Sequence, residues 1–438
     1  MIILRTVKNI SSLNIAASVL LFLAAILAAV VANSSLSPVY QDFLLQELHL
    51  RIGNFNLFSH GGHPLKMIEF INDCLMTVFF LAVGLEIKRE LLVGELSSVR
   101  KAALPFIAAC GGMVVPVVIY ALSVASGTPE TRGMAIPMAT DIAFSLGVLS
   151  LLGKRVPLSL KIFLTAFAVV DDIGGILVIA LFYSADVAYG YLIAAAVLYV
   201  FLYYMGKFGV TQKIFFLFFG VIIWYLFLQS GIHSTISGVI LAFVIPARPR
   251  LDAGKYIERI RDIIGEFPVS KSDNIVLTNA QIATLKQVER ASDYVISPLQ
   301  SLEDNLHGAV SFVILPLFAF ANAGVVFSGS GSIVGDVSIA VAAGLLLGKF
   351  LGIYLFTWLA VKSGVALMPA GMNWKNIAGV SLLGGIGFTV SLFIANLSFA
   401  DEYPELLNQA KFGVLVGTVL AGVLGYVVLN WVLLKREK

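Results

Sequence analysis

The chain has 438 residues, of which 59% are hydrophobic and only 13% are charged. A soluble domain carries about 25% charged residues, so this surplus of apolar side chains cannot be hidden in a water-soluble core and requires a lipid bilayer. The net charge of +3 at pH 7 comes without an arginine-rich run, which argues against nucleic acid as a partner.

Twelve segments are long and apolar enough to cross a bilayer, which takes about 20 residues. We therefore expect an all-α polytopic membrane protein whose residues 1–438 form one integral-membrane domain. The predicted spans are residues 14–33, 66–87, 102–124, 133–152, 157–183, 188–206, 212–229, 231–247, 308–328, 337–361, 374–398 and 412–434.

The first span follows Arg5 and Lys8, a pattern that a signal peptide shares. Its apolar run is long enough to span and eleven more spans follow, so we interpret it as an uncleaved helix. The two cysteines, Cys74 and Cys110, lie in apolar stretches expected near opposite faces of the membrane. We predict that they are unpaired and behave as small buried hydrophobic residues.

Lysine and arginine are distributed unevenly between the segments that link these spans. If the N-terminus is cytoplasmic, the outer links contain only Arg51, Lys66, Arg132 and Lys411, and the inner links and termini contain most of the others. Because an excess of basic residues marks the cytoplasmic side, this alternation predicts that both termini are cytoplasmic.

Two segments are predicted to lie outside the membrane. Residues 40–63 include an alternating stretch with Gly53 and Asn54 in it, which favours a short external hairpin that could support a homodimer. Residues 248–306 form a long polar cytoplasmic loop between spans 8 and 9, with helical periodicity from residue 280 to 299. The sequence assigns this loop no chemistry beyond a solvated linker or a regulatory helix.

Four ionisable residues fall near the middle of predicted spans: Asp141 in span 4, Asp171 and Asp172 in span 5, and Lys349 in span 10. Each such group costs about 2.5–3.5 kcal/mol on insertion scales. One explanation is a set of buried salt bridges that only fix helix packing. However, three acids face one base, and the excess negative charge is relieved by binding a mobile cation or proton.

Asp171 and Asp172 are adjacent, and neighbours on a helix point about 100° apart. One carboxylate can therefore face a water-filled cavity while the other turns toward Lys349 on another helix. We expect these groups to titrate as a coupled unit. Oxygen ligands suit a hard cation, so Asp171 and Asp172 are predicted to hold a transported Na⁺ or Li⁺ rather than a resident metal.

Spans 4 and 11 contain residues that interrupt helices. Pro137 precedes Thr140 and Asp141 in span 4, and Gly384, Gly385 and Gly387 lie near the centre of span 11. The two spans run in opposite directions, so we predict two interrupted antiparallel helices built from inverted repeats. Asp141 would neutralise the positive helix ends and Lys349 the negative ones. Alternatively, the glycines only allow close helix packing.

These motifs resemble the NhaA family of sodium/proton antiporters, and the resemblance extends over nearly the whole chain. It rests on residues 84–91 (GLEIKREL), 135–137 (AIP), 139–144 (ATDIAF), 169–173 (VVDDI), 315–324 (LPLFAFANAG), 348–349 (GK) and 385–389 (GIGFT). The loop 248–306 looks longer than the family pattern, and Asp304 stands where that pattern has a histidine.

The resemblance implies a bacterial inner-membrane protein that exchanges cytoplasmic Na⁺ or Li⁺ for external H⁺. It also implies that exchange is electrogenic, activated at alkaline pH, driven by the proton gradient and without a cofactor. By motif position, Asp171 and Asp172 carry the ions, Lys349 pairs with Asp171, and Thr140 and Asp141 line the crossing of the interrupted helices. Four further residues are implied in pH sensing: Glu86, Arg89, Glu303 and His233. A titrating and a neutral, hydrogen-bonded state of His233 both remain open.

Two other classes of function share single features of this pattern. An intramembrane aspartyl protease also needs two aspartates, but on separate helices with a Gly-x-Gly-Asp motif that is absent here. A sodium-coupled symporter of an organic solute would need a polar substrate pocket, for which spans 4, 5, 10 and 11 offer few groups. The sequence thus favours a transporter, not an enzyme.

Overall fold

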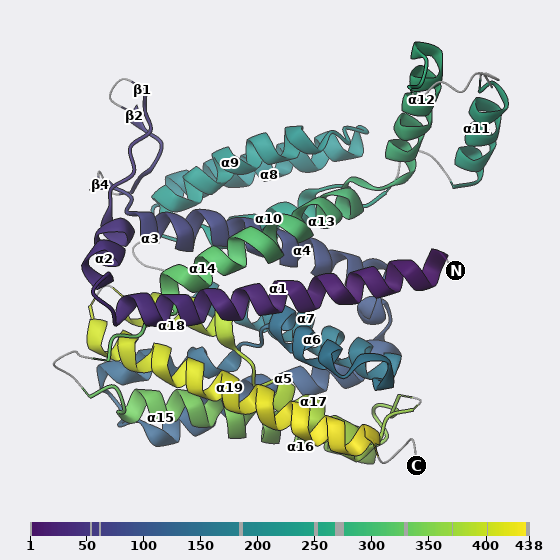
Figure 1. Cartoon of the computed structure of the whole chain (residues 1–438). Helices are drawn as coiled ribbons and strands as arrows, with labels where there is room; N and C mark the ends of the chain where they lie inside the picture. Colours follow the sequence, from purple (N-terminus) through teal and green to yellow (C-terminus); the bar gives the residue numbers. More distant parts are fainter. Residues whose placement is uncertain are drawn as a thin grey trace.

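The computed structural model describes residues 2–52, 55–60, 63–183, 187–248, 253–267, 276–327, 332–369, 371–400 and 402–434. In this part of the chain, long helices run side by side along one common direction (Figure 1). The N-terminal end of α1 and the C-terminal end of α19 lie at the same end of the helix bundle (Figure 1). The predicted all-α polytopic architecture is confirmed.

Nine helices within the described ranges are long and apolar enough to cross a membrane. Six are uninterrupted, and the first five of these are α1 (Ile2–Ala32), α5 (Val99–Ser123), α7 (Leu158–Phe182), α8 (Tyr189–Lys207) and α9 (Lys213–Ser230). Three are composite, each with a π-helical turn inside, and span Met67–Val93, Pro298–Asn322 and Asp336–Lys362. The last is α19 (Pro404–Leu434).

The composite helices divide into shorter segments. These are α3 (Met67–Phe70), η1 (Ile71–Leu75) and α4 (Met76–Val93); α13 (Pro298–Ala309), η5 (Val310–Ile314) and α14 (Leu315–Asn322); and α15 (Asp336–Ala343), η6 (Gly344–Gly348) and α16 (Lys349–Lys362). The π-helical turn η6 ends directly before Lys349. Such turns concentrate at functional sites because they re-aim the side chains that follow.

Two bent pairs bring the number of spans to eleven: η3 (Pro129–Met138) with α6 (Ile142–Leu151), and α17 (Trp374–Leu383) with α18 (Phe388–Phe399). The remaining predicted span, the eighth (residues 231–247), contains α10 (Thr235–Val244), a helix of ten residues that is too short to cross a bilayer by itself. Lys88 of α4 donates hydrogen bonds to the carbonyls of Ala242, Phe243 and Ile245 at the C-terminal end of α10. A lysine suits this position because those carbonyls have no partner within the helix.

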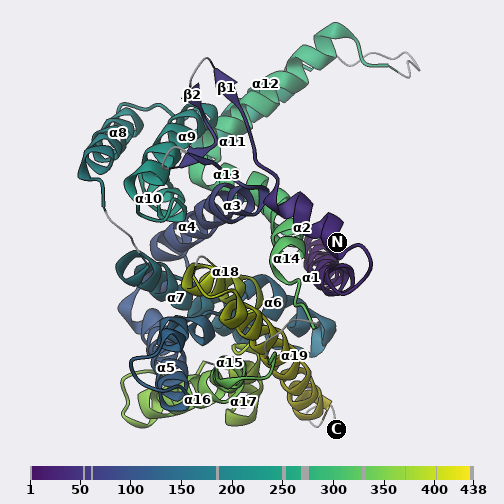
Figure 2. The same cartoon turned by 90° about the vertical axis from the view of Figure 1, so that its left-hand side faces the viewer.

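The helices form two groups that meet at the centre of the molecule (Figure 2). Figure 2 shows α4, α8, α9, α10 and α13 in one group, and α5, α15, α16, α17 and α19 in the other. In the second group, Gly111 of α5 meets Gly352 of α16, where an added Cβ would lie 2.3 Å from the partner's carbonyl oxygen. This close approach holds the start of α16, and with it Lys349, against α5.

The predicted external segment 40–63 overlaps α2 (Ser37–Leu45) and two antiparallel strand pairs, β1 (Arg51–Ile52) with β2 (Phe55–Asn56) and β3 (Ser59–His60) with β4 (His63–Pro64). They lie at the end of the bundle opposite the chain termini (Figure 1). The Tyr40 hydroxyl ties α2 to α14 by donating to the Phe320 carbonyl at 2.7 Å. Cys74 and Cys110 are free and half-buried.

The predicted cytoplasmic loop 248–306 contains α11 (Ala253–Gly265) and α12 (Asn279–Val295). The following helix, α13, already starts at Pro298 rather than near residue 308. Residues 298–306 therefore continue directly into a span, which changes where Glu303 lies relative to the bundle. Two short 3₁₀ turns, η2 (Glu95–Ser97) and η4 (Gly153–Arg155), complete the described elements.

Candidate ion-binding site

Two interrupted helices cross at the centre of the molecule. The first is bent by 45° between η3 and α6, after Pro137, and the second by 44° between α17 and α18, at residues 384–387. The half η3 packs against α18, and α6 packs against α17, so the two broken helices run antiparallel. The predicted interruptions are confirmed at these positions. Each break leaves backbone groups without a helical partner, in a region where water cannot satisfy them.

Asp141 accepts hydrogen bonds at the N-terminal, partially positive ends of two helices. Its Oδ1 accepts a hydrogen bond from the backbone N–H of Phe144 at 2.9 Å and so caps the N-terminus of α6. Its Oδ2 accepts from the backbone N–H of Thr389 at 3.2 Å and from the Thr389 hydroxyl at 2.6 Å, at the start of α18. Because helix N-termini carry partial positive charge, one buried carboxylate stabilises both.

The carbonyl groups at the C-terminal, partially negative ends of the helix segments before each break have hydrogen-bond partners other than the one we predicted. We predicted that Lys349 would compensate them, but hydroxyl groups donate to these carbonyls instead. Thr140 donates to Gly384 at 2.8 Å and Ser145 to Leu383 at 3.0 Å. A third hydroxyl, that of Ser391 in α18, donates to Ile136 at 2.8 Å. Neutral donors suffice because the carbonyls carry only partial charges.

Lys349 forms a buried ion pair with Asp171. Its Nζ lies 2.6 Å from Asp171 Oδ2, and both side chains are fully buried. The pair joins α16 to α7. Two opposite charges removed from water offset each other's desolvation cost only at such close range.

Asp172, the next residue, faces elsewhere. It lines a cavity of about 310 Å³, together with Thr140 and Asp141. The rotation of about 100° between neighbouring residues separates the two carboxylates as the sequence predicted. One acid is held by a lysine, and the other is accessible to a small ion in the cavity.

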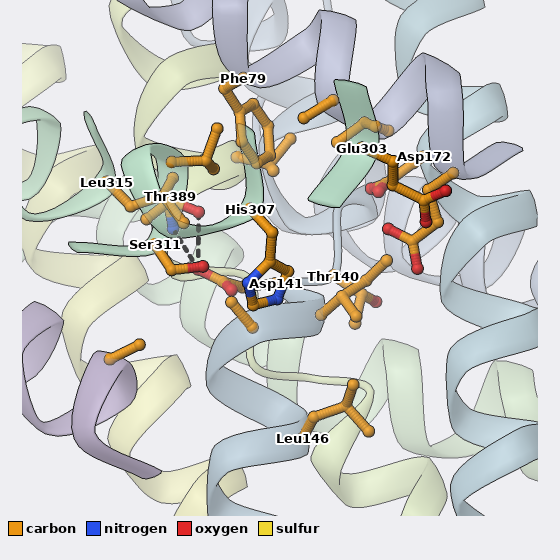
Figure 3. A pocket seen from close by; sticks show the side chains of 18 of the residues that line it. Phe79, Thr140, Asp141, Leu146, Asp172, Glu303, His307, Ser311, Leu315 and Thr389 are labelled. Atoms are coloured by element: carbon orange, nitrogen blue, oxygen red, sulfur yellow. Dashed lines mark hydrogen bonds between the residues drawn. The ribbon is translucent and has the colours of Figure 1, made fainter. Parts of the chain in front are cut away.

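The cavity lies between the two helix groups. Glu303, His307 and Ser311 of the helix that begins at Pro298 line this cavity together with Asp141 and Asp172, as the labelled side chains in Figure 3 show. Its lining also includes residues from the parts of α4 and α13 that are nearer the end with the chain termini (Figure 1). The cavity therefore extends from Asp172 toward that end of the bundle.

A charged network borders this cavity. Arg89 of α4 forms an ion pair with Glu303 of α13, with Nε and Oε1 2.8 Å apart, and a second with Glu90 at 2.9 Å. Glu86, one turn before Glu90, lines the cavity with Arg89. Three of the four residues predicted to respond to pH thus lie together. His233 lies in the link between α9 and α10 and is not part of the cavity lining.

Three residues of the site, His307, Ser311 and Thr389, were not predicted from the sequence. His307 follows Glu303 by four residues, so the two share one face of α13. That spacing was a usable signal, but the predicted span began at residue 308 and left His307 outside it. Thr389 lies in a recognised motif, yet only the crossing of the helices reveals its bond to Asp141.

Oxygen atoms of Thr140, Asp141 and Thr389 line the cavity together with the Asp172 carboxylate. Among the described residues, no group of three or more histidine, cysteine, aspartate or glutamate side chains could hold a metal ion. A cation at Asp172 would therefore complete its shell with hydroxyl, backbone or water oxygens. Such a shell suits a hard monovalent ion that binds and leaves, rather than a permanent metal centre.

Many apolar spans, two broken helices and buried carboxylates on a cavity define a polytopic ion transporter. A family model described as Na⁺/H⁺ antiporter 1 matches residues 8–429. Proteins named Na⁺/H⁺ antiporter NhaA are similar throughout: that of Bacteroides fragilis is 75% identical over 437 residues, and that of Bacteroides thetaiotaomicron 74% over 438, each covering 100% of both chains. That of Saccharophagus degradans, named NhaA 1, is 43% identical over 416 residues, or 94% of this chain and 88% of the relative.

The chain belongs to the NhaA family of Na⁺/H⁺ antiporters. Membership places it among multi-pass membrane transporters and not among enzymes. The resemblance predicted from seven short motifs is thereby confirmed.

Proposed function

We propose that this protein exchanges cytoplasmic Na⁺ or Li⁺ for external protons by alternating access at the Asp171–Asp172 pair. The observation that carries the proposal is that the two adjacent acids have different surroundings. Asp172 lines the cavity, whereas Asp171 is paired with Lys349 at 2.6 Å. A cation entering the cavity meets an uncompensated carboxylate, and a second protonatable group lies in the adjacent residue.

The exchange cycle follows from competition for one site. At low cytoplasmic proton activity the acids lose their protons, Na⁺ enters from the cytoplasm, and the loaded site turns outward. External protons then displace Na⁺, and the protonated site returns. Na⁺ and H⁺ each neutralise the buried negative charge of the site. The site therefore changes its access from one side of the membrane to the other more easily with either ion bound than when it is empty and charged. One site thus couples the two ions without separate machinery.

Electrogenic exchange requires more than one proton for each monovalent cation. The Asp172 carboxylate supplies one proton. The Asp171–Lys349 pair supplies another if its lysine is protonated only when Asp172 is free of Na⁺. Coupled groups at this distance share their protons, so the pair and Asp172 titrate together. Exchange would then respond to the membrane potential as well as to the pH difference.

Activation at alkaline pH follows from the same competition. Protons at high concentration hold the site in its neutral form and exclude Na⁺, so rising pH exposes the cation site. The Arg89–Glu303 ion pair and Glu86 border the cavity and would tune the local potential. We infer that these charges, together with His307, set the pH of activation.

The orientation proposed for the protein is N- and C-termini inside, in the inner membrane of a bacterium. Two observations support it: both helix ends lie at one face of the bundle (Figure 1), and most basic residues of the links fall on that side of the predicted topology. The cavity reaches Asp172 from the same face, which would make this conformation inward-open. A homodimer through residues 40–63 stays a prediction.

Everted membrane vesicles test the proposed exchange directly. A pH gradient, acidic inside, is formed by respiration and followed with a fluorescent amine. Adding NaCl or LiCl should dissipate the gradient in vesicles that contain the protein, and more strongly at alkaline pH. KCl is the matched control and should have little effect. A gradient that NaCl leaves intact at every pH, with the protein present in the membrane, would contradict the proposal.

A further inference from the structure

The exchange function leaves α11 and α12 without a role, although α11 is strongly amphipathic. At about 100° per residue, all its large apolar side chains fall within an arc of about 120°, and its acids fall on the opposite face. The apolar side chains are Tyr256, Ile257, Ile260, Ile263 and Ile264, with Phe267 directly after the helix. A stripe of this kind needs an apolar partner.

The neighbouring helix α12 covers only part of the stripe. The two helices pack against each other, with Tyr256 and Ile263 half-buried. Ile257 and Ile264 remain 58% exposed. On α12, Val288 is half-buried, and Leu285 is 47% exposed. Packing between the helices therefore leaves an uncovered apolar edge on each of them.

These two edges lie on the same side of the hairpin. Viewed along each helix axis, the exposed apolar residues lie about 90° around the helix from the residues that pack against the other helix. On both helices this rotation is in the sense in which the chain winds from its N-terminal to its C-terminal end. The two helices are antiparallel, since α11 leads away from the bundle and α12 returns to it (Figure 1). For antiparallel partners that rotation points to one common side. Four exposed residues form this apolar side: Ile257, Ile264, Ile282 and Leu285.

The hairpin itself lies at the level of the membrane surface. The preceding helix α10 ends at Val244 within the bundle, and α13 begins a span at Pro298, three residues after the end of α12. Both ends of the hairpin are thus fixed at the bundle end that carries the termini. In Figure 1, α12 runs across the direction of the spans, and Figure 2 shows it extending sideways past the edge of the bundle.

Basic side chains border the apolar side. Viewed along the axis of α11, Arg261 lies about 40° around the helix from Ile257. Lys286 lies at the same angle from Ile282 on α12. Both are exposed. One acid, Glu289, lies on the edge itself, one turn after Leu285 and closer to the bundle. An apolar strip with flanking cations matches a surface of hydrocarbon beneath anionic headgroups.

We propose that the α11–α12 hairpin lies on the cytoplasmic surface of the bilayer as an amphipathic lipid anchor. Its apolar side enters the headgroup layer beside the bundle, and Arg261 and Lys286 contact anionic lipid. The lipid-facing surface of the bundle and the apolar side of the hairpin thereby become continuous. Since α12 leads into α13, which carries Glu303 and His307, the anchor also fixes the start of a helix that lines the cavity.

The test compares two positions of α12 in the full-length protein. Cys74 and Cys110 are replaced by alanine, and a single cysteine is introduced as Leu285→Cys or Gln287→Cys and labelled with an environment-sensitive fluorophore. Both positions are exposed, but Gln287 lies on the opposite side of the hairpin. The labelled proteins are reconstituted into phosphatidylcholine–phosphatidylglycerol vesicles that contain lipids with a nitroxide near the headgroup.

The label at position 285 should be quenched several-fold more by the nitroxide lipids than the label at 287, and should emit at shorter wavelength. Equal, weak quenching at both positions would overturn the proposal. So would a 285 label that neither nitroxide lipid nor aqueous iodide reaches, because a second copy or a protein partner would then cover it. Arg261→Gln with Lys286→Gln should reduce quenching at 285; unchanged quenching would remove the role given to these cations.

Discussion

Lys349 and Asp171 are 178 positions apart in the sequence, yet the Nζ of one lies 2.6 Å from the Oδ2 of the other, with both side chains inaccessible to solvent. The next carboxylate, Asp172, lines the cavity without this lysine. The two acids of one motif therefore differ: one is a compensated charge that joins α7 to α16, and the other is a carboxylate on the cavity that binds the ion in the proposed exchange.

Lys349→Ala should destabilise the protein by about 3–5 kcal/mol, because it leaves the Asp171 charge buried without a partner. The measurement is thermal unfolding of the purified protein in detergent. Asp171→Asn combined with Lys349→Ala should recover most of the lost stability, because no uncompensated charge remains. If the single and the double variant unfold at the same temperature, the ion pair does not contribute in this way.

Asp172→Asn should abolish Na⁺-dependent dissipation of the pH gradient, because the accessible carboxylate of the cation site is lost. The substitution is nearly isosteric, so the protein should still fold and reach the membrane. Asp42→Asn, at an exposed position of α2, is the matched control and should exchange normally. Full activity of Asp172→Asn in everted vesicles would show that the cation binds elsewhere.

Asp141→Ala should both destabilise the crossing and impair exchange. It removes the acceptor at two helix N-termini, at a cost of about 0.5–2 kcal/mol for each cap. Asp141→Asn keeps an oxygen acceptor but no charge, so it should lose less stability than the alanine variant. Thermal unfolding of both variants separates capping from charge. Equal stability of Asp141→Ala and the parent protein would contradict the double cap.

Arg89→Gln and Glu303→Gln should move the pH of activation in opposite directions. Loss of the arginine leaves the cavity more negative, which strengthens proton binding at Asp172 and moves activation to higher pH. Loss of the glutamate leaves Arg89 without one of its acidic partners and moves activation to lower pH. A charge about 10 Å away at an effective dielectric of about 20 corresponds to roughly one pH unit.

The control for this pair is the double variant, Arg89→Gln with Glu303→Gln, which removes one positive and one negative charge and so leaves the net charge unchanged. Its profile should lie close to that of the parent protein in an assay of exchange rate against pH. Shifts of the two single variants in the same direction would mean that they act through local structure rather than through the potential of the cavity.

The sequence by itself determined the membrane class, the approximate spans, the mid-span charges and the two interruptions. These properties are local: a run of apolar residues must leave water wherever it lies, and Pro137 or Gly385 disturbs a helix through its own backbone chemistry. Adjacent acids at positions 171 and 172 also had to diverge by about 100°, whatever surrounded them. The family resemblance followed from short motifs of the same local kind.

Only the tertiary structure decided which groups meet. Thr389 reaches Asp141 across 248 positions, and hydroxyl groups rather than Lys349 satisfy the carbonyls at the breaks. His307 enters the cavity because α13 begins ten residues before the predicted span, whereas His233 lies outside it. Such contacts depend on the rotation and register of helices that are distant in sequence, and helix packing sets both. Hydropathy and spacing along a single chain carry no information about either.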